Sequence, residues 1–206
     1  MLRVAQQGDF WSGDKFELNM TFESLRDYQW DRLIKAIWSY AKIHGPYEER
    51  YSPGQPEPPK TEAKKAEPTA TYTEFGIFEI APDVKVGLEV LVTRSLFECV
   101  SILIPVKMFE NFNTAPESAD YQALVQAFYE MALEMYQMTT FSIAAIGINR
   151  GCQLLLEMVT DQAVRDVFVK QGDFLARDDA LGALRLQPRL YKEVKPTLRW
   201  APATHK

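Results

Sequence analysis

The 206-residue sequence predicts an α+β fold, in which a mainly antiparallel sheet carries helices packed on one face. Alternating apolar and polar residues recur in short segments joined by tight turns, which is the pattern of neighbouring antiparallel strands. Two longer segments repeat apolar residues at helical spacing. The expected order is ββα, βββα and ββαα. A long proline-rich loop and an extended C-terminal tail complete the predicted chain.

The first group of elements is a hairpin followed by a helix. Strands at 2–10 and 15–22 flank a turn at 11–14, where Gly13 can adopt the positive φ that tight turns require. A helix from about Ser24 to His44 is predicted, because Gly45 and Pro46 then end it. Its apolar face contains Trp30, Leu33, Ile34, Ile37, Trp38 and Ala41.

Residues 45–70 differ from the rest in composition. They hold six of the twelve prolines and no periodic apolar residues. Such a segment buries too little apolar surface to offset the entropy of ordering it. The sequence therefore predicts a flexible polar loop, and the alternative is an arm that binds a partner.

The remaining elements follow the same periodicities. Three strands are expected at 72–80, 84–93 and 97–107, followed by a helix at 119–139. A second hairpin is expected at 141–148 and 152–159, and short helices at about 161–172 and 178–186. We expect a single domain over 1–187, with the proline-rich loop within it, and a basic extended tail over 188–206.

Charge separates this tail from the body. Residues 180–206 hold six basic side chains and one acidic, whereas the other 179 residues hold 17 basic and 27 acidic. Basic and aromatic side chains are common interface anchors. The sequence therefore predicts that the tail binds a partner, and the alternative is that it wraps around the acidic body. The candidate partner-binding residues are Arg189, Tyr191, Lys192, Lys195, Arg199 and Trp200.

Motifs for catalysis are scarce. The two histidines, His44 and His205, are too few for a histidine-rich metal site, and no phosphate-binding glycine loop or nucleophile elbow occurs. We therefore assign no catalytic, cofactor-binding or metal residue. Five acids lie within predicted strands and either face solvent or line a covered polar site: Glu74, Glu79, Glu89, Glu98 and Glu157.

These observations favour a non-enzymatic protein-interaction or assembly subunit that uses the loop and the tail. Its partner would be another protein or a second copy, with an acidic surface for the tail, and the net charge of −5 disfavours nucleic acid. The alternative is a small-molecule-binding protein or hydrolase whose pocket is lined by the strand carboxylates. The sequence lacks a secretory signal and a membrane-spanning run, and Cys99 and Cys152 lie in apolar runs that favour reduced thiols. The expected location is therefore the cytoplasm, away from membranes.

Overall fold

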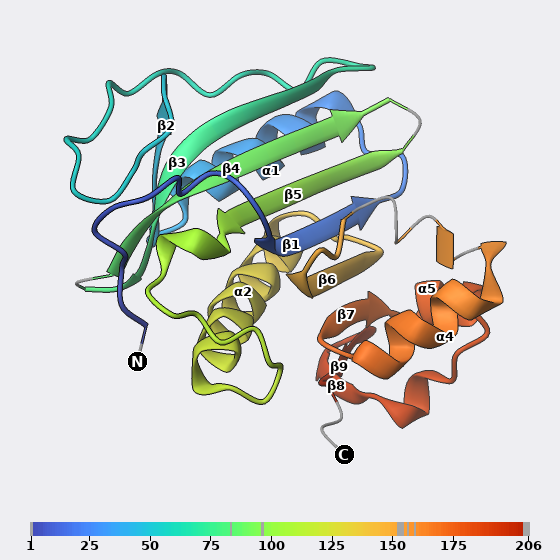
Figure 1. The fold of residues 1–206 in the computed structure, drawn as a ribbon. Helices are drawn as coiled ribbons and strands as arrows, with labels where there is room; N and C mark the ends of the chain where they lie inside the picture. Colours follow the sequence, from blue (N-terminus) through green and yellow to red (C-terminus); the bar gives the residue numbers. More distant parts are fainter. Residues whose placement is uncertain are drawn as a thin grey trace.

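The computed structural model describes residues 2–82, 84–95, 97–151, 155, 157, 158 and 160–203. A nine-stranded antiparallel sheet runs in the order β2-β3-β4-β5-β1-β6-β7-β9-β8, which confirms the α+β class (Figure 1). The strands are β1 (Lys15–Phe22), β2 (Ile43–Tyr47), β3 (Thr71–Ala81), β4 (Val84–Arg94), β5 (Glu98–Pro105), β6 (Ile143–Ile148), β7 (Phe174–Arg177), β8 (Lys192–Lys195) and β9 (Leu198–Ala201). The helices are α1 (Asp27–Ser39), α2 (Ala119–Met138), α4 (Gln162–Gln171) and α5 (Asp178–Ala183).

The centre of the sheet is its first strand. Leu18 of β1 lies opposite Ile102 of β5 on one side and opposite Ile146 of β6 on the other. The apolar residues of β1 face α2, where Phe128 packs with its ring 5.7 Å from Phe16 and 5.8 Å from Phe78. Alternate residues of β1 therefore point into the main core.

Helices cover both faces of this sheet. α1 and α2 pack on one face, as expected, and build the main core there. On the opposite face of β6 and β7, α4 and α5 form a second core around Phe168, Phe174 and Leu181. The expectation of helices on one face is therefore wrong for the C-terminal helices, because Ala144 and Ala145 of β6 are both buried, on opposite faces.

Three predicted elements differ from the structure. Residues 2–10 form no strand, because their polar residues 6–9 are exposed, although Val4 makes an isolated bridge with Phe109. The helix ends at Ser39, and Gly45 and Pro46 lie in β2, an edge strand where a missing backbone donor is tolerated. In the predicted strand 152–159, the described residues 155, 157 and 158 are helical, and Leu155 and Met158 share the second core at helical spacing.

The C-terminal segment is part of the sheet. Residues 188–190 form a 3-10 turn, after which β8 and β9 make a hairpin. β9 pairs along β7, with Leu175 opposite Trp200. The prediction of an extended tail is therefore wrong for 188–203, since these residues form the last two strands, and 204–206 lie outside the described residues.

The proline-rich loop runs along the outer edge of β2 (Figure 1). The Glu48 N–H donates to the Pro59 carbonyl at 3.0 Å, and the Thr61 N–H donates to the Pro46 carbonyl at 2.9 Å. Tyr47 also bridges to Lys60. Residues 59–61 thus occupy the position where a further strand would add, and they protect this edge of the sheet.

Two further features bear on location. Cys99 of β5 is buried and disulfide-bonded, so the expectation of a reduced thiol is wrong for Cys99, while Cys152 lies outside the described residues. Within the part of the chain that the structure describes, no helix is long and apolar enough to cross a bilayer.

Candidate functional site

The six residues predicted to bind a partner lie in the C-terminal hairpin and in the segment just before it, and both aromatic residues among them pack internally. The Trp200 ring lies 4.8 Å from the Tyr129 ring of α2. The Tyr191 ring lies 5.7 Å from the Phe174 ring and extends the second core. Both aromatic residues therefore pack against the chain's own domain. This agrees with the alternative given above, in which the C-terminal segment contacts its own body.

Arg199 is also used within the chain. Its guanidinium donates to both carboxylate oxygens of Asp178, at 2.7 and 3.0 Å, and to Glu193 at 2.7 Å. This bidentate pair holds the pKa of the Asp178 carboxyl below its usual range. The positive charge of Arg199 is thus compensated by two acids of the same chain.

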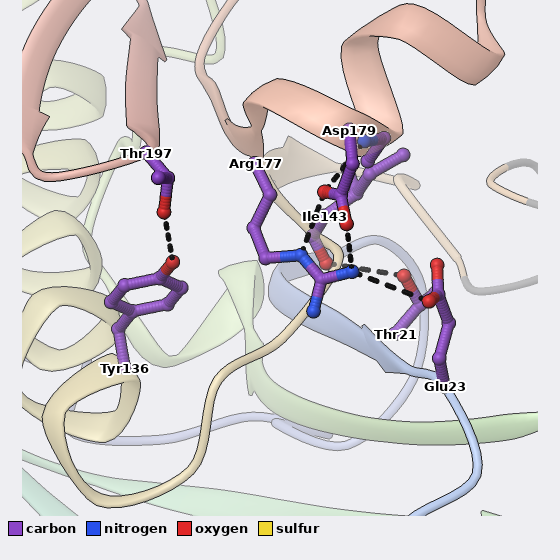
Figure 2. Close-up of polar contacts among 8 residues, drawn as sticks. Thr21, Glu23, Tyr136, Ile143, Arg177, Asp179 and Thr197 are labelled. Carbon is purple, nitrogen blue, oxygen red and sulfur yellow. Dashed lines mark hydrogen bonds and ion pairs between the residues drawn. The ribbon is translucent and has the colours of Figure 1, made fainter.

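Polar contacts lie near the turn of the hairpin and at the end of β7, its neighbour in the sheet (Figure 2). The Tyr136 hydroxyl of α2 lies 3.4 Å from the Thr197 hydroxyl in the β8–β9 turn. Arg177, at the end of β7, pairs with Asp179 at 2.6 Å and reaches Glu23 beyond β1 at 3.2 Å. The hairpin is therefore joined to α2 by the Tyr136–Thr197 contact and to β7 by strand pairing along β9.

A basic edge remains after these internal contacts. We use this name for Arg189, Leu190, Lys192 and Lys195, which follow one another along β8 and the turn before it. Among the described residues, no carboxylate forms an ion pair with any of these three cations. Leu190 is 71% exposed, the largest value among the large apolar side chains described. Sequence reasoning selected the three cations by charge but missed Leu190, because an isolated leucine carries no signal of exposure.

The two ends of the sheet differ. β2 ends the sheet on one side, and loop residues 59–61 occupy its outer edge. β8 ends it on the other side, with β9 as its one strand neighbour among the described residues. The backbone groups on the outer side of β8 are therefore available to an added strand.

The strand acids are held separately. The Glu74 carboxylate accepts from the Trp38 indole at 3.1 Å and from the Lys64 N–H at 2.7 Å, and it thereby joins α1 to the proline-rich loop. Glu98 accepts from the Leu25 N–H at 2.7 Å, just before α1.

The other three acids are likewise apart. Glu89 pairs with Arg50 at 2.7 Å on the opposite face of the sheet. Glu79 lies 3.3 Å from His44, and Glu157 is exposed. None of the five acids lines any of the three grooves described next, so these carboxylates do not converge in them.

Three of the grooves in the described structure have volumes of about 850, 320 and 220 Å³. The intermediate groove lies between α2 and the hairpin, where Tyr129, Lys192 and Trp200 contribute to its wall. The largest lies at the other end of the sheet, between the N-terminal segment and α2. Among the described residues, no three His, Cys, Asp or Glu side chains are grouped closely enough to hold a metal ion.

Comparison with protein-family models, with curated proteins and with solved structures finds no match to this chain. The geometry of the basic edge and of the grooves is therefore the basis for the proposals below.

Proposed function

We propose that this protein is a non-enzymatic interaction module that binds an acidic, extended segment of a partner protein along the outer edge of β8. The observation that carries the proposal is the difference between the two sheet ends. The loop protects β2, whereas β8 has no strand on its outer side among the described residues. An unpaired edge strand is a template for strand addition.

The side chains around β8 define the chemistry of the partner. Strand addition supplies backbone hydrogen bonds, and the side chains then select the sequence. Arg189, Lys192 and Lys195 favour carboxylates, because complementary charge speeds association and disfavours wrong partners. Leu190 adds apolar contact area beside the edge. The preferred partner therefore alternates acidic and apolar residues.

The same charges disfavour pairing between two copies at this edge. In a fully overlapping antiparallel pair of two β8 strands, Lys192 of each copy would lie opposite Lys195 of the other. Like charges directly opposite each other destabilise a strand pair. Three cations on a chain of net charge −5 also give weak support for binding a polyanion such as nucleic acid. Both observations favour a different, acidic protein as the partner.

A peptide-binding experiment tests the proposal. A fluorescent peptide of about six residues, the length of an average strand, alternates glutamate and valine. We expect it to bind the protein, and we expect a lysine–valine peptide of equal length not to bind. The double variant Lys192→Glu/Lys195→Glu should weaken binding by at least about tenfold, or ~1.4 kcal/mol.

The matched control is Lys35→Glu/Lys170→Glu, which reverses two exposed charges on α1 and α4. It changes the net charge equally, so it should bind the acidic peptide as the unmodified protein does. Equal losses in the two double variants, or equal binding of both peptides, would refute a specific site on β8.

A cytoplasmic location remains part of the proposal, and the disulfide at Cys99 provides its test. Disulfides persist in oxidising compartments and are rare in the cytoplasm. Acid quenching of the cells, followed by alkylation of free thiols under denaturing conditions and mass spectrometry, shows whether Cys99 is reduced, although it is buried in the folded protein. A labelled Cys99 supports the cytoplasm, and an unlabelled one that reacts after reduction points to an oxidising compartment.

A further inference from the structure

We propose that the groove of about 850 Å³, the largest of the three described above, binds an uncharged, mostly apolar small molecule. We call it the N-terminal groove, and its volume of about 850 Å³ lies within the usual range of small-ligand sites, roughly 300–1,000 Å³. It lies at the opposite end of the sheet from β8, so this site is independent of the proposed function. Its apolar lining includes Leu2, Val4, Ile80, Val84, Ala123 and Ala127.

The first wall is the N-terminal segment, which backbone hydrogen bonds hold in place. The Ala5 N–H donates to the Met108 carbonyl at 2.9 Å, and the Glu110 N–H donates to the Arg3 carbonyl at 2.8 Å. Leu2 is buried and Val4 half-buried as a result. The N-terminal segment, for which a strand was predicted, thus forms an ordered wall of the groove beside α2.

The second wall is the side of α2, and the third is the turn between β3 and β4. Ala123 and Ala127 lie one helical turn apart, and their small side chains leave space against the helix. Ile80 and Val84 stand at the ends of β3 and β4 and are half-buried. Apolar side chains from three separate parts of the chain therefore line one hollow.

The charges at the groove compensate one another. Lys42 lies 3.4 Å from Glu130, whose other oxygen accepts from Gln126 at 3.0 Å, and these hydrogen bonds lower the pKa of the Glu130 carboxyl. Arg3 and Glu110, which carry opposite charges, lie on segments that a backbone hydrogen bond joins. Among the described lining residues, the charged side chains are therefore two cations and two anions.

This balance sets the class of ligand. An anionic ligand would approach Glu110 or Glu130, a cationic one would approach Arg3 or Lys42, and either would lose water on entering an apolar groove. A neutral ligand avoids both costs. The smallest groove shares Val4, Gln6 and Pro82 with this one, which extends the hollow toward the proline-rich loop and suits an elongated molecule.

The test uses N-phenyl-1-naphthylamine, a neutral apolar dye whose fluorescence rises on binding. We expect the dye to bind and 1-decanol to displace it at lower concentration than decanoate or decylammonium. Ala123→Trp fills the groove and should weaken dye binding by at least about tenfold. Its matched control is Ala183→Trp, an exposed position at the end of α5, which should bind normally.

A second variant guards against a folding defect in the first. Val4→Asp places a charge in the wall but lies outside the sheet, and it too should weaken binding while circular dichroism stays unchanged. Absence of dye binding to the unmodified protein would overturn the proposal, as would normal binding by both groove variants. Stronger displacement by decanoate or decylammonium than by decanol would overturn the neutral class of ligand. None of these outcomes affects peptide binding at β8, so the two proposals fail separately.

Discussion

Replacing Arg50 with alanine should detach the proline-rich loop from the sheet while the sheet stays folded. The Arg50 guanidinium lies over the rings of Trp11 and Phe75, 5.0 and 5.3 Å from their centroids. It also donates to the buried Glu89 carboxylate at 2.7 Å. Arg50 therefore ties the first part of the loop to the face of the sheet opposite α1 and α2.

The magnitude follows from these two interactions. A hydrogen bond to a charged group contributes about 1.5–3 kcal/mol, and a cation–π contact at an exposed site about 0.5–1 kcal/mol. The side chain of Arg50 is 51% exposed, and Lys15 still pairs with Glu89 after the substitution, so the lower ends of both ranges apply. Arg50→Ala should thus lower the local stability of the loop by about 2 kcal/mol.

Amide hydrogen exchange measures this effect segment by segment. We expect faster exchange at Glu48 and Thr61, whose N–H groups bond across the loop, and faster proteolysis between 52 and 60. Exchange in β5 and β1 should stay as it is. Arg185→Ala, at an exposed position far along the chain, is the control. Unchanged exchange at Glu48 and Thr61 would refute the role of Arg50, and a uniform loss across the sheet would show that the loop does not open separately.

Three further changes test the core, a buried acid and the hairpin. Trp38→Ala should lower the free energy of unfolding by about 3 kcal/mol, because it creates a cavity and removes a donor to buried Glu74; an unchanged urea midpoint would contradict this. Burial raises the pKa of the Glu17 carboxyl, so this group holds its proton more tightly in the folded than in the unfolded protein. As pH rises above about 4.5, ionisation of Glu17 therefore lowers the free energy of unfolding. The difference in urea midpoint between Glu17→Gln and the unmodified protein should therefore increase, in favour of the variant, as pH rises above about 4.5. A difference that does not change with pH would exclude the effect. Arg199→Glu adds a third negative charge beside two acids and should speed amide exchange across β8 and β9, whereas unaltered exchange would show that these ion pairs do not hold the hairpin.

The parts of the fold that the sequence predicts are those in which local periodicity and burial agree. β3, β4, β5 and α2 each show one clear period over eight or more residues. The helical segment that contains Leu155 and Met158 was predicted as a strand, because a short apolar run fits both structures. The C-terminal strands are four residues long and gain their structure from pairing with β7, a contact between distant segments.

The same distinction applies to the candidate sites. Charge alone selected Arg189, Lys192 and Lys195, since an excess of basic residues is visible in a sequence. Charge does not show whether a cation is paired within the fold. Arg199 was therefore selected on the same grounds as the other three, although it forms an ion pair with Asp178. The N-terminal groove was missed, because its walls come from three distant segments and none of them carries a motif.

The loop over β2 limits how many molecules can join one sheet. A sheet open at both ends could receive a strand at one end and offer the other end to the next molecule, and addition would continue into a fibre. With residues 59–61 across β2, one added strand at β8 leaves no second end for growth on this chain. Copies of this chain therefore cannot be linked end to end through β2 and β8, and each copy can receive an added strand at its β8 end alone.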